Sequence, residues 1–93
     1  MTVIFWIPGP LTSMTGGRSH VNVESAGSTL QDALEALFVA HPGIRDRVLT
    51  ERGEIRVHVN VFVGNCEARR AAGLATPLAA GTEISIIPAI SGG

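Results

Sequence analysis

The residues best suited to chemistry are the last ones, because the chain ends in IIPAISGG, Ile86 to Gly93. Gly has no Cβ, so a Gly-Gly end can enter a narrow cleft and bring the backbone close to a ligand. A terminal Gly also leaves its carboxyl carbon unshielded by any side chain. A separate enzyme that activates this carboxylate would use both properties. The alternative is an ordinary frayed terminus.

The other reactive side chains do not form a pattern typical of a catalytic or metal site. The only cysteine, Cys66, cannot form an internal disulfide, and we interpret it as an incidental small residue in a turn. The histidines, His20, His41 and His58, are scattered, so we expect no metal site. No Ser/His/Asp or Cys/His arrangement is evident, which predicts that the chain is not an enzyme.

Length and composition predict one globular domain, residues 1–93, with 45% apolar and 16% charged residues. The formal net charge of −1 offers no basic excess to neutralise phosphates, so nucleic-acid binding is not expected. The apolar stretches are too short to span a bilayer, and the N-terminus has no basic region typical of a secretory signal. We therefore expect a cytoplasmic protein.

Hydrophobic periodicity predicts five strands and one main helix. Alternating or β-branched runs predict strands at residues 2–8, 20–25, 55–64 and 84–90, with a brief strand at 67–69. Ser28 and Gln31 form a predicted capping box that starts the helix, and Pro42-Gly43 ends it. The segment 11–19 is expected to be a turn, and residues 44–49 a short helical turn.

This order of elements predicts an α+β fold, a helix packed on one face of a mixed sheet, with the first and last strands central and parallel. That arrangement is the ubiquitin-like β-grasp. Strand parity and helical spacing predict which side chains point inward. The expected inward set is Val3, Phe5, Ile7, Leu30, Leu34, Leu37, Val57, Val59, Val61, Ile84 and Ile86.

A β-grasp pattern that ends in Gly-Gly resembles the MoaD/ThiS family of ubiquitin-like sulfur carriers, most closely the carrier of a cysteine-synthesis pathway. The resemblance covers the whole chain and is strongest from His58 to Gly93. There, GTEISIIPAISGG is similar to the family's ending, Gly-Asp followed by alternating apolar residues, Pro and Gly-Gly. Thr82 stands where Asp is commoner, in a predicted loop.

The resemblance implies a function as a sulfur carrier. A ubiquitin-activating-like adenylyltransferase and sulfurtransferase would adenylate Gly93 with ATP and convert it to a thiocarboxylate. A cysteine-synthase-like enzyme would accept the sulfur. Ser91 and Gly92 would thread the partner's active site, while Pro88 would stiffen the exit from the sheet. The carrier itself would bind no cofactor.

Two alternatives to this function stay open. The chain resembles the small subunit of molybdopterin synthase almost equally well. A ubiquitin-like interaction module, or a modifier conjugated to amines, would also end in Gly-Gly. The sequence contains no lysine, since its seven basic residues are all arginine. Genome composition explains this simply, although a lysine-free carrier would also be unable to form an isopeptide with itself.

The open face of the sheet is the expected partner surface. If Val3, Phe5 and Ile7 point inward, then Ile4 and Trp6 point outward, because side chains alternate along a strand. The same parity directs His58, Phe62 and Ile87 outward. We expect Trp6, Ile87 and Phe62 to form an exposed apolar row near the tail, and such patches commonly mark interaction sites.

Overall fold

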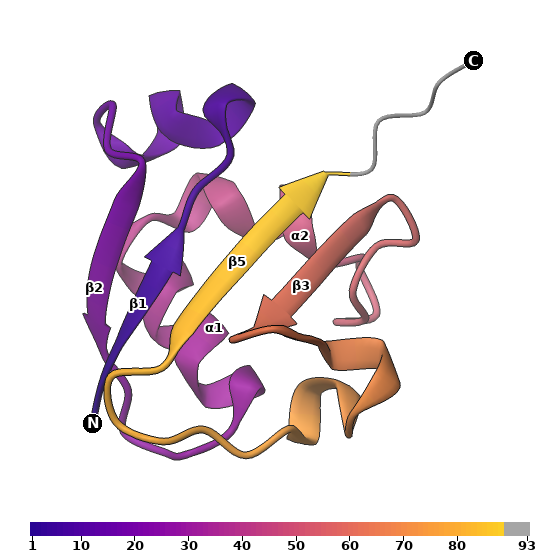
Figure 1. Ribbon diagram of the computed structural model, residues 1–93. Helices are drawn as coiled ribbons and strands as arrows, with labels where there is room; N and C mark the ends of the chain where they lie inside the picture. Colours follow the sequence, from indigo (N-terminus) through magenta and orange to yellow (C-terminus); the bar gives the residue numbers. More distant parts are fainter. Residues whose placement is uncertain (89–93) are drawn as a thin grey trace.

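The computed structural model describes residues 1–88, and its centre is a five-stranded mixed sheet (Figure 1). The strand order is β2-β1-β5-β3-β4. β1 and β5 pair in parallel, whereas the other neighbours are antiparallel, which confirms the predicted β-grasp arrangement. The strands are β1 (Thr2–Trp6), β2 (His20–Glu24), β3 (Val59–Val63), β4 (Cys66–Glu67) and β5 (Glu83–Pro88).

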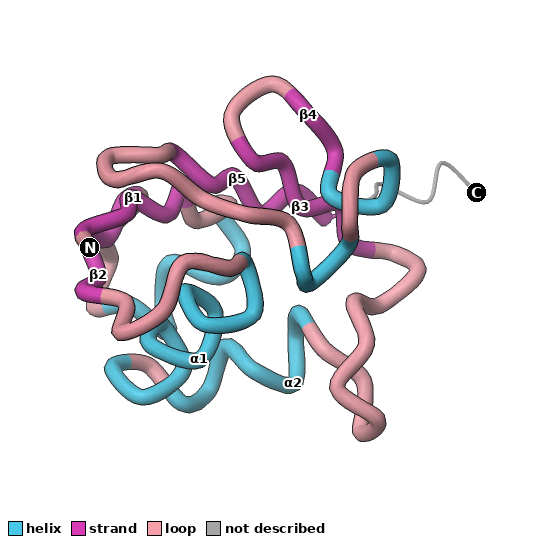
Figure 2. The backbone as a smooth tube through the Cα atoms, turned by 90° about the horizontal axis from the view of Figure 1, so that it is seen from below, coloured by secondary structure: helices cyan, strands magenta, loops and turns pink. Residues whose placement is uncertain are grey.

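The helices lie on one side of this sheet (Figure 2). The main helix, α1, packs its apolar stripe against the strands, and a short helix, α2, follows it. Four 3-10 turns join the elements. The helices are α1 (Leu30–Ala40) and α2 (Arg45–Val48), and the 3-10 turns are Gly9–Thr15, Pro42–Ile44, Ala68–Arg70 and Gly73–Ala75.

The core lies between α1 and the sheet and matches the predicted inward set except at one position. Every member of that set other than Val57 is buried. The short helix adds to the core as expected, because Ile44 and Val48 are both fully covered. Side chains on β1, β3 and β5 alternate as predicted, so those that do not point into the core lie on the face opposite α1.

Val57 was predicted to be buried, but 79% of it is exposed, because the valine strand begins later than its alternation indicates. The predicted strand covered residues 55–64, whereas β3 begins at Val59. Ile55 instead bridges to Leu49 at the end of α2, and the Val59 N–H donates to the Arg56 carbonyl at 3.0 Å. This turn carries Val57 away from the sheet, so its alternation with Val59 has no structural meaning.

The start of α1 also differs from the prediction by one residue. Thr29, not Ser28, is the N-cap, and its hydroxyl accepts the Asp32 N–H at 3.3 Å while the Asp32 carboxylate accepts the Thr29 N–H at 3.3 Å. The Ser28 carbonyl accepts the Leu78 N–H at 2.7 Å, and Thr29 bridges to Pro77. This pairing keeps the chain extended through Thr29, which delays the helix.

The segment after β1 is a 3-10 helix rather than the predicted turn. Pro8 and Pro10 fix φ at its start, where a missing N–H costs nothing. Its last residue, Thr15, is buried, and the hydroxyl donates to carbonyls of Thr12 at 3.1 Å and Arg18 at 2.7 Å. These local hydrogen bonds therefore order a segment that its glycines predict to be an irregular turn.

Candidate functional site

The predicted reactive end of the chain follows directly from the central strand. β5 lies between β1 and β3, and its last residue, Pro88, pairs with Val59. The predicted residues Ser91, Gly92 and Gly93 lie outside the described residues. The structure therefore fixes where the C-terminal segment begins: at the end of β5, a strand that is paired on both sides (Figure 1).

The outward side chains of the strands form the open face of the sheet. Trp6 is 43% exposed and Ile87 is 45% exposed, as their parity predicts, while Phe62 is half-buried. The register corrects the expected row: Ser85, not Ile87, lies between Trp6 and Phe62. Ile87 lies opposite Asn60, two residues closer to the end of β5. We call Trp6, Phe62 and Ile87 the apolar patch.

Trp6 is held in place by polar neighbours that the sequence analysis did not single out. Its indole Nε1 donates to a carboxylate oxygen of Glu83 at 2.5 Å. Its ring also lies 5.3 Å from the His20 ring, centroid to centroid, at an interplanar angle of 44°. His20 and Glu83 belong to the neighbouring strands β2 and β5, so only the strand register could have identified them.

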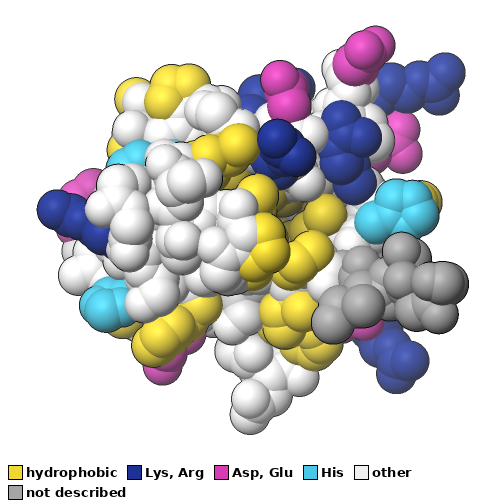
Figure 3. All heavy atoms as spheres, turned by 90° about the horizontal axis from the view of Figure 1, so that it is seen from above, with side chains coloured by type: hydrophobic (Ala, Val, Ile, Leu, Met, Phe, Trp, Pro, Cys, Tyr) yellow, Lys and Arg dark blue, Asp and Glu magenta, His cyan; other side chains and the backbone are white. Residues whose placement is uncertain are grey.

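A shallow depression lies beside Trp6 and Ile87 of the apolar patch. Between the ends of the parallel strands β1 and β5, both exposed and core side chains reach the surface, and the depression is lined by Trp6, Ile7, Pro8, Ser85, Ile86 and Ile87. Figure 3 looks onto the end of the molecule toward which β5 points, and yellow apolar side chains gather near the centre of this view. An extended peptide or an apolar partner side chain fits such a surface better than a polar metabolite does.

Basic side chains flank the same end of β5. Another depression there is lined by Asp46, Arg47, Arg56, His58, Val59 and Pro88. The Arg56 Nε donates to the Asp46 carbonyl at 2.6 Å, and Arg69 donates to the Arg56 carbonyl at 2.5 Å and to Asn60 Oδ1 at 3.2 Å. We call Arg47, Arg56, His58 and Arg69 the tail-exit rim. Most dark blue side chains, which are arginines in this chain, lie in the right half of Figure 3.

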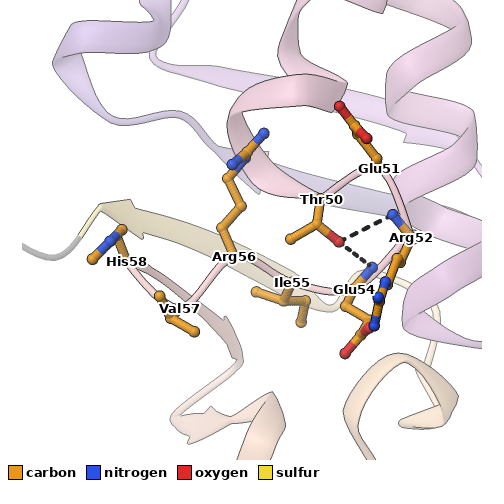
Figure 4. Close-up of a pocket in the computed structure, with 8 residues that line it drawn as sticks. All are labelled: Thr50, Glu51, Arg52, Glu54, Ile55, Arg56, Val57 and His58. Atoms are coloured by element: carbon orange, nitrogen blue, oxygen red, sulfur yellow. Dashed lines mark hydrogen bonds between the residues drawn. The ribbon is translucent and has the colours of Figure 1, made fainter.

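A further pocket lies on the loop between α2 and β3 and shows no arrangement suited to catalysis (Figure 4). The Thr50 hydroxyl accepts backbone N–H groups of Arg52 at 3.2 Å and Glu54 at 3.3 Å, which closes the loop. Within residues 1–88, no three His, Cys, Asp or Glu side chains gather as metal ligands would. Cys66 is exposed and is the first residue of β4, where it pairs with Val63, rather than part of the predicted turn.

None of the helices in the described part of the chain has the length and apolar character needed to cross a bilayer.

Several known proteins are similar to this chain in sequence and in fold over nearly their whole length. Sulfur carrier protein CysO of Mycobacterium tuberculosis is 34% identical over 95 residues, which cover 100% of both chains. Small archaeal modifier protein 1 of Haloferax volcanii is 39% identical over 84 residues, 89% of this chain and 91% of the relative. A chain in the crystal structure of the Amycolatopsis orientalis BexX/CysO complex superposes with a TM-score of 0.87 at 31% identity, covering 98% and 99% of the two chains.

The sheet order, the main helix packed on the sheet and the strand that leads to Gly-Gly define a ubiquitin-like β-grasp protein of the sulfur-carrier type. The sequence model of the ThiS family matches residues 5–93, and the chain belongs to that family. Its named relatives are carrier and modifier proteins rather than catalysts, so the chain is classed as a carrier and not as an enzyme.

Proposed function

We propose that the chain carries sulfur as a thiocarboxylate on Gly93 and donates it in a biosynthetic pathway, cysteine synthesis being the favoured one. The observation that carries this proposal is the full-length similarity to sulfur carrier protein CysO, which includes the Gly-Gly end. The position of β5 agrees with it, because a paired central strand presents the following residues from a rigid base.

The proposed chemistry requires no side chain of the carrier. The Gly93 carboxylate attacks the α-phosphorus of ATP on a ubiquitin-activating-like partner, and pyrophosphate leaves. Hydrosulfide then attacks the acyl carbon, AMP leaves and the S–H proton passes to water, which gives the thiocarboxylate. Adenylation supplies the leaving group that a carboxylate lacks. ATP is thus a substrate of the partner, and the carrier binds no cofactor of its own.

The apolar patch is the proposed docking surface for the partner enzymes. Trp6, Phe62 and Ile87 lie on the open face, and Trp6 and Ile87 also line the depression between β1 and β5. A partner that covers this surface would bury apolar area next to the segment it must receive. The BexX/CysO complex gives a precedent for a partner protein bound to a chain of this type.

Intact mass spectrometry tests the proposal. The chain is incubated with ATP, a sulfide source and an activating enzyme encoded in the same genome, and one oxygen should be replaced by one sulfur. A variant lacking Gly93 is the matched control and should remain unchanged. If every candidate activating enzyme leaves the mass of the full chain unaltered, the carrier proposal fails.

A second candidate, attachment to other proteins, is favoured by one observation: the 39% identity to small archaeal modifier protein 1. In that case the activated Gly93 carbonyl would be attacked by an amine of a target protein, and an amide would form. The same reaction mixture distinguishes the two functions when an acceptor protein is added. A carrier gives a thiocarboxylate of unchanged chain length, whereas a modifier gives a branched product at the summed mass, less one water.

A further inference from the structure

Basic groups lie beside the end of β5, yet none of them is an amine. The tail-exit rim supplies guanidinium and imidazole groups, and the sequence has no lysine anywhere. A guanidinium stays protonated in proteins and has no free electron pair with which to attack a carbonyl. A lysine ammonium has the same charge, but it loses a proton readily enough to act as a nucleophile.

The rim lies within reach of the end of the chain. Five residues follow Pro88, and five residues span at most ~17 Å when fully extended. Arg47, Arg56 and His58 line the same depression as Pro88. An amine at one of these positions would therefore be available to an activated Gly93 of the same molecule.

The α-amino group of Met1 lies at the opposite end of the sheet (Figure 1). It donates to the Ser25 carbonyl at 3.0 Å and lies 3.7 Å from a Glu24 carboxylate oxygen. Ile4 pairs with Glu83 in the parallel β1–β5 ladder. Met1 lies three residues before Ile4 and Pro88 lies five residues after Glu83, so the two residues are eight residues apart along the strand direction. At ~3.3 Å per residue the separation is about 26 Å, beyond the reach of the C-terminal segment.

We propose that the tail-exit rim is a basic surface without amines, which prevents an activated Gly93 from being captured by its own chain. The activated acyl group then passes only to a separate molecule. This inference rests on the proposed function, because it requires that Gly93 is activated. The step that the rim prevents is amide formation: an amine nitrogen attacks the Gly93 carbonyl carbon, the bond to the leaving group breaks, and the amine proton passes to the leaving group or to water.

His58 does not offer a lasting alternative. An acyl group transferred to its imidazole would remain activated, so water or a thiol would release it. The Cys66 thiol could likewise exchange with a thioester, but reversibly. Only an amine would capture the tail as a stable product.

The test uses a Gly93 thioester made by thiolysis of an intein fusion, so it needs no activating enzyme. Cys66→Ser is present in every variant to remove thiol exchange. Arg47→Lys and Arg56→Lys each place one amine in the rim without changing its charge. The matched control is Ala80→Lys: Ala80 is exposed, and the next residue, Gly81, donates its N–H to the Thr2 carbonyl at 2.7 Å, which fixes it at the far end of the sheet.

Intact mass measured over time in dilute solution reports the outcome. At least one rim variant should form a cyclic amide, one water lighter than the hydrolysed acid, in about tenfold higher yield than Ala80→Lys, because the intramolecular amine has a high effective concentration. The parent chain should give hydrolysed acid alone. Circular dichroism verifies that each variant is folded.

Two results would overturn the proposal: folded Arg47→Lys and Arg56→Lys thioesters that both simply hydrolyse, or a parent chain that cyclises as readily as they do. Neither result depends on whether an enzyme loads sulfur onto Gly93. A failed loading experiment and a failed rim experiment are therefore distinguishable.

Discussion

At the scale of single residues, the open face is marked by two large, partly exposed apolar side chains, Trp6 and Ile87. The indole of Trp6 is fixed by the Glu83 carboxylate and the His20 ring, yet 43% of the residue faces solvent. A held aromatic side chain loses little conformational freedom when a partner covers it. Such a residue is well suited to anchor an interface.

Trp6→Ala and Ile87→Ala are expected to weaken binding to the activating enzyme by at least ~1 kcal/mol each, because each removes an exposed apolar side chain of the patch. The melting temperature should change little. Titration calorimetry measures the binding. Val39→Ala is the control, since Val39 is also exposed, at 83%, but lies on α1 on the other side of the sheet. Wild-type affinity in both patch variants would remove the patch from the interface.

The two valines Val57 and Val61 provide a direct test of the corrected parity. Val61 is 1% exposed and Val57 is 79% exposed, although the sequence places them in one alternating run. Val61→Ala should lower the free energy of unfolding by about 1–3 kcal/mol through lost burial and a residual cavity. Val57→Ala should remain within about 0.5 kcal/mol of wild type. Urea denaturation measures both, and equal losses would contradict the turn at Arg56–Val59.

At the scale of elements, the sequence determines which segments form strands and helices better than it determines where they begin. The apolar stripe of α1 and the parity of β1 and β5 follow from side-chain periodicity, which local sequence contains. The late starts of β3 and α1 do not follow from this periodicity. They depend on pairing of Ile55 with Leu49 and of Thr29 with Pro77, contacts between residues that only the folded chain brings together.

The same limit applies to the candidate site. The outward parity of Trp6 and Ile87 could be predicted from the alternation of each strand alone. The placement of Ser85 between Trp6 and Phe62, and of His20 and Glu83 beside Trp6, requires the register of three strand pairs. Register is set by packing and by the connections between strands, so no single segment encodes it.

The N-cap of α1 is testable as an element-scale property. Thr29→Ala should destabilise the protein by ~0.5–2 kcal/mol, because it removes the acceptor for the Asp32 N–H. Ser28→Ala should be nearly neutral, within about 0.5 kcal/mol, since Ser28 is exposed and contributes its backbone carbonyl. Thermal denaturation compares the two variants. A larger loss of stability for Ser28→Ala than for Thr29→Ala would instead support the capping box that the sequence predicts at Ser28.

At the scale of the whole molecule, the fold separates the part that must be stable from the part that must react. β5 is paired on both sides, and two of its residues, Ile84 and Ile86, are buried in the core. We therefore expect that the sheet cannot form without this strand. The proposed reactive group, on Gly93, lies five residues beyond Pro88, the last described residue of β5. A carrier built in this way can pass its C-terminal segment to successive enzymes while the core remains folded.

This separation predicts opposite results for two truncations. A chain of residues 1–88 keeps all the described strand pairs and buried side chains, so its circular dichroism and cooperative melting should resemble those of the full chain. A chain of residues 1–82 loses the central strand and leaves β1 and β3 without their shared neighbour, and it should be unfolded at room temperature. Neither can be loaded with sulfur, because both lack Gly93. If the 1–88 chain unfolds, the final five residues contribute to the core, and the tail cannot be handed to a partner without a cost in stability.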